Sequence, residues 1–229
     1  MSKFFVVATP IGNLDDISFR AIEILKSVDL VLAEDTRVSK KLFDRYKINT
    51  KLDSYNSFST ERKKNKIIDL LRDKKDIALI SDAGTPTISD PGVKIVSDLY
   101  KEFGNNPEIE IIPIPGASAV LSALSVSGFP SSEFIFYGFL PHKKGRETIF
   151  KEITENKKTS VFYESPHRLT KALDSLEKFC EKDREIFVAR ELTKMYEEKI
   201  RGGVKEVKEF FDKNSKKIRG EFVIVVSGK

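Results

Sequence analysis

The alternation of short apolar runs with amphipathic helical patterns is the feature that most constrains the fold of this chain. Four apolar runs in the first half are expected to be buried strands: 4–8, 30–33, 77–80 and 109–114. Helical patterns lie between and after these runs, at 17–28, 36–46, 60–73 and 93–103. Because parallel strands need crossover connections, this βαβα order predicts a mainly parallel sheet with helices on both faces.

Three local details sharpen this expectation. Asp15 or Asp16 is expected to cap the helix that begins near residue 17, since short acidic side chains accept hydrogen bonds from the first free amides. Pro113 and Pro115 are expected to break the strand at 109–114, because proline lacks the N–H that a ladder needs. The last helix of this half is expected to pack through the stripe Val93, Val96, Leu99, Tyr100 and Phe103.

The pattern changes after residues 115–118, where the strands become longer and more aromatic. Strands are expected at 134–139, 160–163, 186–189 and 222–226, with a helix through Leu169, Leu173 and Phe179 between them. The stretch 195–204 is a further candidate strand. The second half is therefore expected to be an α/β domain with a mixed sheet. The boundary lies between residues 113 and 120, which gives domains at 1–115 and 119–229.

Composition limits the classes of protein to which the chain can belong. Of 229 residues, 40% are hydrophobic and 33% are charged, which suits a globular protein with a sizeable core. The net charge of +5 permits an anionic partner such as RNA, although a lysine-rich proteome explains it equally well. The single cysteine, Cys180, excludes an internal disulfide. His142 and His167 lack neighbours at metal-ligand spacing, so no metal site is expected.

Missing motifs exclude other classes. The chain has neither a G-x-G-x-x-G fingerprint nor a Walker A sequence, which disfavours dinucleotide oxidoreductases and nucleotide hydrolases. Its N-terminus does not resemble a signal peptide, and no apolar stretch is long enough to cross a bilayer. A cytoplasmic protein without membrane contact is expected.

Three loops follow expected strands, at 9–13, 81–92 and 113–119. The carboxyl ends of parallel strands are where ligands bind in open sheets. In the second loop, Gly84 permits close approach of the backbone to a ligand, and Pro86 stiffens the chain. The alternative is that these are ordinary strand-to-helix turns.

Charged side chains also gather near strand ends. The carboxylates Glu34, Asp35, Asp82, Glu164 and Glu191 are candidates for a general base, with helix capping or ion pairing as the alternative. Three basic clusters are candidates for phosphate contacts, with a solvated face as the alternative for each: Arg37, Lys40, Lys41, Arg45 and Lys47; Arg62, Lys63, Lys64 and Lys66; and His142, Lys143, Lys144 and Arg146.

Eight motifs in order resemble one known family. They are VATPIGNL (7–14), AEDTR (33–37), SDAGTP (81–86), ISDPG (88–92), GFLP (138–141), FYESPHRL (162–169), ARELTK (189–194) and RGEFV (219–223). Together they resemble the RsmI family of bacterial 16S rRNA (cytidine-2′-O)-methyltransferases, within the tetrapyrrole-methylase-like superfamily. The resemblance covers essentially the whole chain. It departs at 116–118, where many relatives have Gly-Pro-Ser, and fits loosely at 195–199.

The resemblance implies an S-adenosyl-L-methionine-dependent enzyme that methylates the ribose of a cytidine, position 1402 in the usual numbering, in 16S rRNA of the small ribosomal subunit. It implies two α/β domains, a cofactor in the cleft between them, a homodimer and no metal. The positions that match the family's cofactor contacts are Pro10, Gly84, Thr85, Pro86, Ile88, Ser118, Ala119, Tyr163, Ala189 and Glu221. Pro10 and Ile11 would lie where substrate and methyl group meet.

The catalytic base stays open, with Glu34, Asp35 and Arg37 as candidate catalytic residues. RNA is expected to engage the helix at 36–46 through Lys40 and Lys41, while a local Glu34–Arg37 pair is the competing explanation. Two rival functions remain. One is another tetrapyrrole-methylase-like enzyme acting on a tetrapyrrole or a modified protein side chain. The other is a non-catalytic RNA-binding assembly factor on the same fold.

Overall fold

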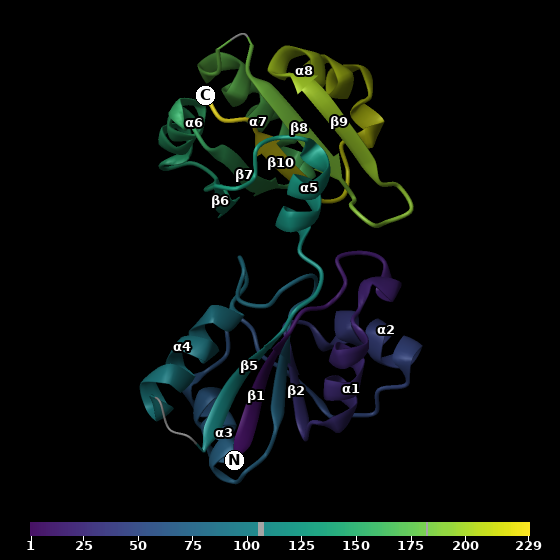
Figure 1. Ribbon diagram of the computed structural model, residues 1–229, viewed down its shortest axis with the longest axis vertical. Helices are drawn as coiled ribbons and strands as arrows, with labels where there is room; N and C mark the ends of the chain where they lie inside the picture. The colour runs from purple at the N-terminus through teal and green to yellow at the C-terminus, as the bar shows by residue number, and fades with distance from the viewer. Residues whose placement is uncertain (105–107, 182) are drawn as a thin grey trace. The chain divides into compact units, whose positions relative to one another are not determined.

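The computed structural model describes residues 1–104, 108–181 and 183–229, and it divides into two compact units (Figure 1). The first unit is Met1–Ser118 and the second is Ala119–Lys229. Each has its own sheet and its own hydrophobic core. In the described ranges, no helix combines the length and apolar character that crossing a membrane requires.

The first unit contains a five-stranded sheet in which every strand pair is parallel, as the apolar runs predicted. The strand order is β3-β2-β4-β1-β5, with β1 Ser2–Val7, β2 Leu30–Ala33, β3 Leu52–Ser54, β4 Ile77–Ile80 and β5 Ile109–Ile114. Every residue of β2 and β4 is buried. Unbroken burial is typical of strands that are covered on both faces.

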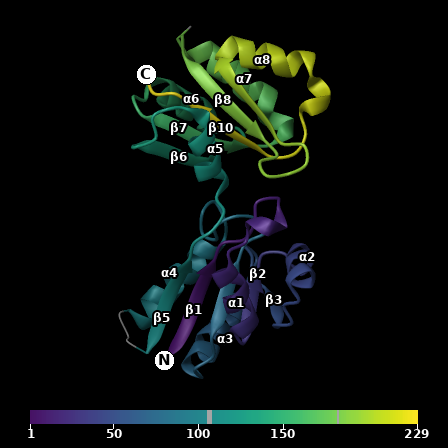
Figure 2. The same cartoon turned by 45° about the vertical axis from the view of Figure 1, so that its right-hand side comes forward.

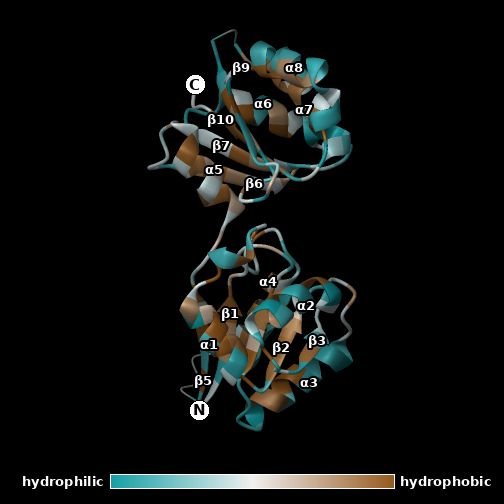
Figure 3. Ribbon diagram, turned by 90° about the vertical axis from the view of Figure 1, so that its right-hand side faces the viewer, coloured by the Kyte–Doolittle hydropathy of each residue, from teal (hydrophilic) through white to brown (hydrophobic). Residues whose placement is uncertain are grey.

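Helices cover both faces of this sheet. On one face, Leu25 of α1 (Phe19–Ser27) and Leu42 of α2 (Thr36–Tyr46) share a core with Val31 of β2. On the other face, helices α3 (Glu61–Arg72) and α4 (Gly92–Phe103) bury Ile67 and Leu99 against the alternate strand positions, such as Leu32. Because neighbouring residues of a strand point to opposite faces, one apolar run supplies both cores. The hydropathy colouring of Figure 3 shows the apolar character of β1 and β2.

Two local expectations for this unit were wrong. Helix α1 is capped by Ser18, whose side chain accepts a hydrogen bond from the Ala21 amide, and not by Asp15 or Asp16. These aspartates lie in a separate 3-10 turn, Leu14–Asp16, which Asn13 caps. Pro113 does not break β5, which pairs with β1 through residue 114. Strand β5 lies at the edge of the sheet, where a missing N–H leaves no partner unsatisfied.

The expected apolar stripe of α4 was also only partly right. Ile95 and Leu99 are the fully buried apolar residues of this helix. Val93 is 57% exposed and Tyr100 is 56% exposed, so both belong to the outer face. Val96, Leu99 and Phe103 pack against the core as expected, so three of the five predicted residues are on the inner face.

The second unit contains a five-stranded mixed sheet, as predicted, in the order β6-β7-β10-β8-β9. The strands are β6 Phe134–Phe139, β7 Thr159–Glu164, β8 Glu185–Arg190, β9 Glu198–Gly203 and β10 Phe222–Val226. Strands β6 and β7 are parallel, and the remaining pairs are antiparallel. Residues 195–197 lie in a turn, so the candidate strand at 195–204 is shorter than expected.

Four α-helices accompany this sheet in the described part of the unit: α5 Ala119–Ser127, α6 Arg146–Glu155, α7 Pro166–Phe179 and α8 Val204–Lys213. Helices α6, α7 and α8 bury Phe150, Leu173 and Phe211 in one core with Phe162 and Ile224 of the sheet. Helix α5 contacts β10 and takes no part in that core (Figure 2).

Candidate functional site

The loops that follow β1 and β4 are hydrogen-bonded to each other. The Thr9 amide donates to the Gly84 carbonyl at 2.9 Å, and the Gly84 amide donates to the Thr9 carbonyl at 3.0 Å. The Thr9 hydroxyl donates to the carbonyl of Ser81 at 3.0 Å. Because β1 and β4 are neighbours in the sheet, two loops that are far apart in sequence form one surface at its carboxyl edge.

The loop after β5 joins the same surface. The Thr85 hydroxyl donates to the Ala117 carbonyl at 3.2 Å. Gly84 has φ +80°, and a Cβ placed there would lie 3.3 Å from Cγ2 of Ile11 and 3.6 Å from the Ala117 carbonyl oxygen. A Cβ at Gly116 would lie 2.9 Å from that of Ala8. The three candidate loops are therefore packed together, and two of their closest contacts require glycine.

The loop after β4 also contains strained backbone that the sequence did not reveal. Thr87 and Ser89 have φ values of +76° and +58°. The Asp90 carboxylate holds this turn by accepting hydrogen bonds from the Thr87 amide at 2.9 Å and the Gly92 amide at 2.6 Å. A left-handed β-branched residue costs about 1–3 kcal/mol and persists only where its surroundings enforce it, as at ligand sites.

Carboxylates meet where the loops after β2 and β4 adjoin. The Asp35 amide donates to Oδ1 of Asp82 at 2.9 Å. Burial raises the pKa of the Glu34 carboxyl above its usual range, and the charges of Asp82 and Asp90 raise it further. Burial also raises the pKa of Asp82. Among the described residues this cluster does not form a metal-binding group.

Asp35 differs from Glu34. Hydrogen bonds from the Arg37 guanidinium and amide lower the pKa of Asp35 to about 2. Nη2 of Arg37 lies 2.6 Å from Oδ2 of Asp35, and the Arg37 side chain is 88% exposed. The local ion pair of this segment therefore joins Arg37 to Asp35 and not to Glu34. The Asp35 carboxylate is also the N-cap of α2, so it has a structural role at the start of this helix.

In the second unit, three of the residues proposed from the sequence lie in or beside adjacent strands. Val223 of β10 pairs with Tyr163 of β7 on one side and with Ala189 of β8 on the other. Glu221 directly precedes β10, and its amide donates to Glu191 Oε1 at 3.0 Å. Burial raises the pKa of Tyr163. Tyr163 and Ala189 therefore lie in one row across the sheet, and Glu221 lies just before the strand between them.

The remaining proposed positions differ in exposure. Pro10 and Pro86 are buried, Thr85 is half-buried and Ile88 is 48% exposed. Ser118 ends the first unit and Ala119 begins the second, and both are half-buried. The first-unit positions thus lie in or beside the packed loops, Ala119 begins helix α5, and the remaining second-unit positions lie in or beside strands of the mixed sheet.

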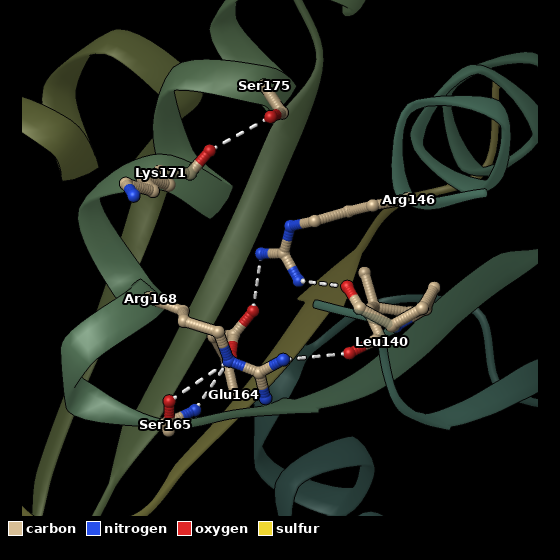
Figure 4. A network of polar contacts seen from close by, with 8 residues as sticks. Leu140, Arg146, Glu164, Ser165, Arg168, Lys171 and Ser175 are labelled. Carbon is tan, nitrogen blue, oxygen red and sulfur yellow. Dashed lines mark hydrogen bonds and ion pairs between the residues drawn. The ribbon is translucent and has the colours of Figure 1, made fainter. Parts of the chain in front are cut away.

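A buried ion-pair network in the second unit was only partly foreseen. Glu164, at the end of β7, has a fully buried side chain between Arg146 and Arg168, with contacts of 2.6 and 2.8 Å (Figure 4). The Ser165 amide donates to Oε1 of the same carboxylate at 2.8 Å. Ion pairing therefore accounts for the position of Glu164. This was the alternative to a role as general base in the sequence analysis. Only the spacing of Arg168, four residues after Glu164, could have signalled this network.

Comparisons with known proteins agree on one family. The model of the Tetrapyrrole (Corrin/Porphyrin) Methylases matches residues 3–208. The "Ribosomal RNA small subunit methyltransferase I" of Thermotoga maritima is 44% identical over 229 residues, which span 100% of both chains. The protein of the same name from Bacillus subtilis is 48% identical over 100% of this chain and 76% of its own length.

Solved structures support the fold. A cobalt precorrin-4 methyltransferase of cobalamin biosynthesis superposes with a TM-score of 0.71 at 19% identity, covering 99% of this chain and 94% of that one. The methyltransferase CobJ superposes with a TM-score of 0.69 at 16% identity, covering 99% of this chain and 93% of that one. At such identities the likeness extends to the arrangement of strands and helices and no further.

Proposed function

We infer the function from the premise that this chain belongs to the tetrapyrrole methylase family, and within it to the ribosomal RNA small subunit methyltransferases I (RsmI). On this premise, we propose that the chain methylates the ribose 2′-hydroxyl of one cytidine in 16S rRNA, with S-adenosylmethionine as the donor. The chain is thus a methyltransferase of small-subunit ribosomal RNA. The observation that carries this conclusion is the 44% identity to the Thermotoga maritima protein over the full length of both chains.

The packed loops of the first unit suit a nucleoside-type cofactor. Gly84 and Gly116 let the three loops pack closely against one another, which would fix their positions before a ligand binds. Apolar Pro86 and Ile88 share one loop with polar Thr85, whose hydroxyl reaches the Ala117 carbonyl of the neighbouring loop. Such a mixture matches a ligand with an aromatic base and a polar tail. We assign Pro10, Ala119, Tyr163, Ala189 and Glu221 to the same cofactor site.

S-adenosylmethionine, when bound, supplies a methyl group on a sulfonium that an attacking oxygen can displace. The contribution of the chain is to hold the acceptor hydroxyl in line and to take its proton. Glu34 is the better candidate for the base, because its raised pKa makes it a stronger proton acceptor than an ordinary carboxylate. Asp35 is tied to Arg37, so we assign these two residues to positioning the acceptor or to structure.

The basic helix α2 remains a proposed contact for RNA. Lys40 and Lys41 are exposed, and their side chains form no ion pair with the described residues. By contrast, Lys63 pairs with Asp53 and Lys64 with Glu61 on α3, which neutralises most of that cluster. We further propose that the enzyme acts as a homodimer in the cytoplasm, where small ribosomal subunits are assembled.

The test is methyl transfer from labelled S-adenosylmethionine to small ribosomal subunits purified from a strain that lacks this gene. We expect a single new 2′-O-methylated cytidine in 16S rRNA, which disappears when the gene is deleted and returns with it. Transfer to a precorrin-like acceptor instead would indicate a tetrapyrrole methylase. Absence of S-adenosylmethionine binding by calorimetry would indicate a non-catalytic assembly factor.

A further inference from the structure

The loop between β6 and α6, residues 140–145, carries two lysine side chains without counter-charges in the described structure. His142, Lys143 and Lys144 are all exposed. Within the ranges that the structure describes, the side chains of Lys143 and Lys144 form no ion pair or hydrogen bond, unlike Lys63 and Lys64 of α3. Unpaired ammonium groups on one short loop retain their full charge for a partner outside the chain.

The loop is anchored to the buried ion-pair network beneath it. Arg168 Nη1 donates to the Leu140 carbonyl at 2.9 Å, and Arg146 Nη1 donates to the Pro141 carbonyl at 3.3 Å (Figure 4). Both guanidinium groups also hold Glu164, whose side chain has 0% exposure. Because the same two arginines bind the carboxylate and the main chain, the start of the loop is fixed to the core.

The charge of this network does not balance. Arg146 and Arg168 are each paired with the single carboxylate of Glu164, so two positive charges face one negative charge. Their side chains are only 12% and 15% exposed, which limits how well water compensates the excess. Poorly solvated charges are costly unless they are paired, and an anion bound at the loop would lower that cost.

The features of the loop fit a polyanionic backbone. Lysine ammonium groups act as point charges for phosphate. Residues 140–145 contain no phenylalanine, tyrosine or tryptophan, so the imidazole of His142 is the one aromatic ring of the loop on which a base could stack. Such a surface would position a phosphodiester chain without reading its sequence. The substrate of the proposed reaction is a nucleic acid of this kind.

We propose that the loop at 140–145 is a docking surface for backbone phosphates of the small-subunit RNA, with Lys143 and Lys144 as the contacting groups and the Glu164 network as their rigid base. This inference rests on the proposed function. It adds a contact in the second unit, which is distinct from the α2 helix of the first.

The test compares two double charge reversals in the full-length protein. Lys143→Glu with Lys144→Glu should weaken binding to purified small subunits about 10-fold or more near physiological salt. The slope of log affinity against log salt should become shallower by about 1.5, because each phosphate contact contributes about 0.7–0.9. The matched control, Lys205→Glu with Lys216→Glu, makes the same change in net charge at exposed positions of α8 and the turn after it.

Each outcome of this experiment decides the inference. An unchanged affinity and salt slope for the Lys143/Lys144 reversal overturns it, as does an equal loss in the control, which would indicate only a general charge effect. Lys143→Arg with Lys144→Arg should retain binding, since the charges remain. Unchanged S-adenosylmethionine affinity by calorimetry verifies folding. If wild-type protein binds subunits but transfers no methyl group, the proposed function fails while the docking surface stands.

Discussion

Gly84 is the residue at which the three loops of the first unit come closest together. Gly84→Val should reduce S-adenosylmethionine affinity more than about 10-fold by isothermal calorimetry, because the branched side chain enters space shared by Ile11 and Ala117. The φ of +80° adds a conformational cost of about 1–2 kcal/mol, so the melting temperature should fall as well.

Gly145 offers a control that separates backbone strain from crowding. Its φ is +82°, close to that of Gly84, and a Cβ there meets nothing within 4 Å. Gly145→Ala should therefore lower stability by a similar conformational term and leave S-adenosylmethionine affinity unchanged. If Gly84→Val binds the cofactor as tightly as wild type, Gly84 does not belong to the cofactor site.

The environment of Glu34 predicts how the free energy of unfolding depends on pH. The pKa of Glu34 in the folded state lies above its ordinary value, because burial and the nearby carboxylates oppose ionisation. The folded state therefore binds more protons than the unfolded state in this range, and stability falls as the pH rises from the unfolded pKa through the folded one. Glu34→Gln removes the penalty and should raise unfolding free energy at pH 7 by less than about 1 kcal/mol.

Denaturant melts of Glu34→Gln and wild type at pH 4 and pH 7 measure this effect. The difference should be larger at pH 7, and methyl transfer should drop sharply if Glu34 is the base. Asp35→Asn is the contrasting variant, because the Asp35 pKa is lowered to about 2. The stability that Asp35 contributes is present above its unfolded pKa and is lost as the pH falls through about 2. A stabilised Asp35→Asn at pH 7 would contradict this assignment.

At the scale of elements, the Glu164 network joins β7, the start of α7 and the start of α6. Glu164→Gln removes the only carboxylate that pairs with Arg146 and Arg168 in the described structure. Breaking a buried pair in this way leaves uncompensated charge and typically costs about 3–5 kcal/mol. We expect a loss of this size in unfolding free energy, measured by denaturant titration.

Glu147→Gln is the matched control for that variant. Glu147 lies on α6 with a 61% exposed side chain and pairs with Lys151 at 3.5 Å. An exposed pair of this kind contributes about 0–1 kcal/mol, so the control should be nearly neutral. Equal effects of the two substitutions would show that the buried network does not stabilise the second unit.

The sequence predicted those elements whose signal is local. The apolar runs of β2 and β4 and the helix at 36–46 agree with the structure because their own burial determines them. Strand β3 was missed, since it is three residues long and its pattern is half-buried to exposed. The cap at Ser18 was missed because two aspartates nearby offered an equally good local signal.

The grouping of the candidate loops was predictable from the sequence, whereas the contacts between them were not. The rule that ligands bind at the carboxyl ends of strands identified the loops correctly as neighbours, although the strand order β4-β1-β5 is not written in the sequence. Contacts between distant segments could not be foreseen. Arg146 meets Glu164 only because β6 and β7 pair in parallel, which brings the start of α6 over the end of β7.

At the scale of the whole molecule, the expected homodimer has a consequence for the second unit. Helix α5 contains no charged residue, and its Leu121 is 58% exposed. A helix that is apolar around most of its circumference is usually covered by other protein. We therefore expect the outer face of α5 to lie at or near the interface between two copies of this chain.

Sedimentation equilibrium at micromolar concentration tests this expectation. Wild-type protein should give about twice the monomer mass of 26.0 kDa, as the preference of oligomers for two-fold symmetry leads one to expect. Leu121→Asp should shift the equilibrium toward monomer, because a carboxylate would be buried against an apolar surface. Phe19→Asp, at a 90% exposed position of the first unit, is the control that should remain dimeric. A wild-type mass near 26.0 kDa at every concentration would refute the dimer. A dimeric Leu121→Asp would instead remove α5 from its interface.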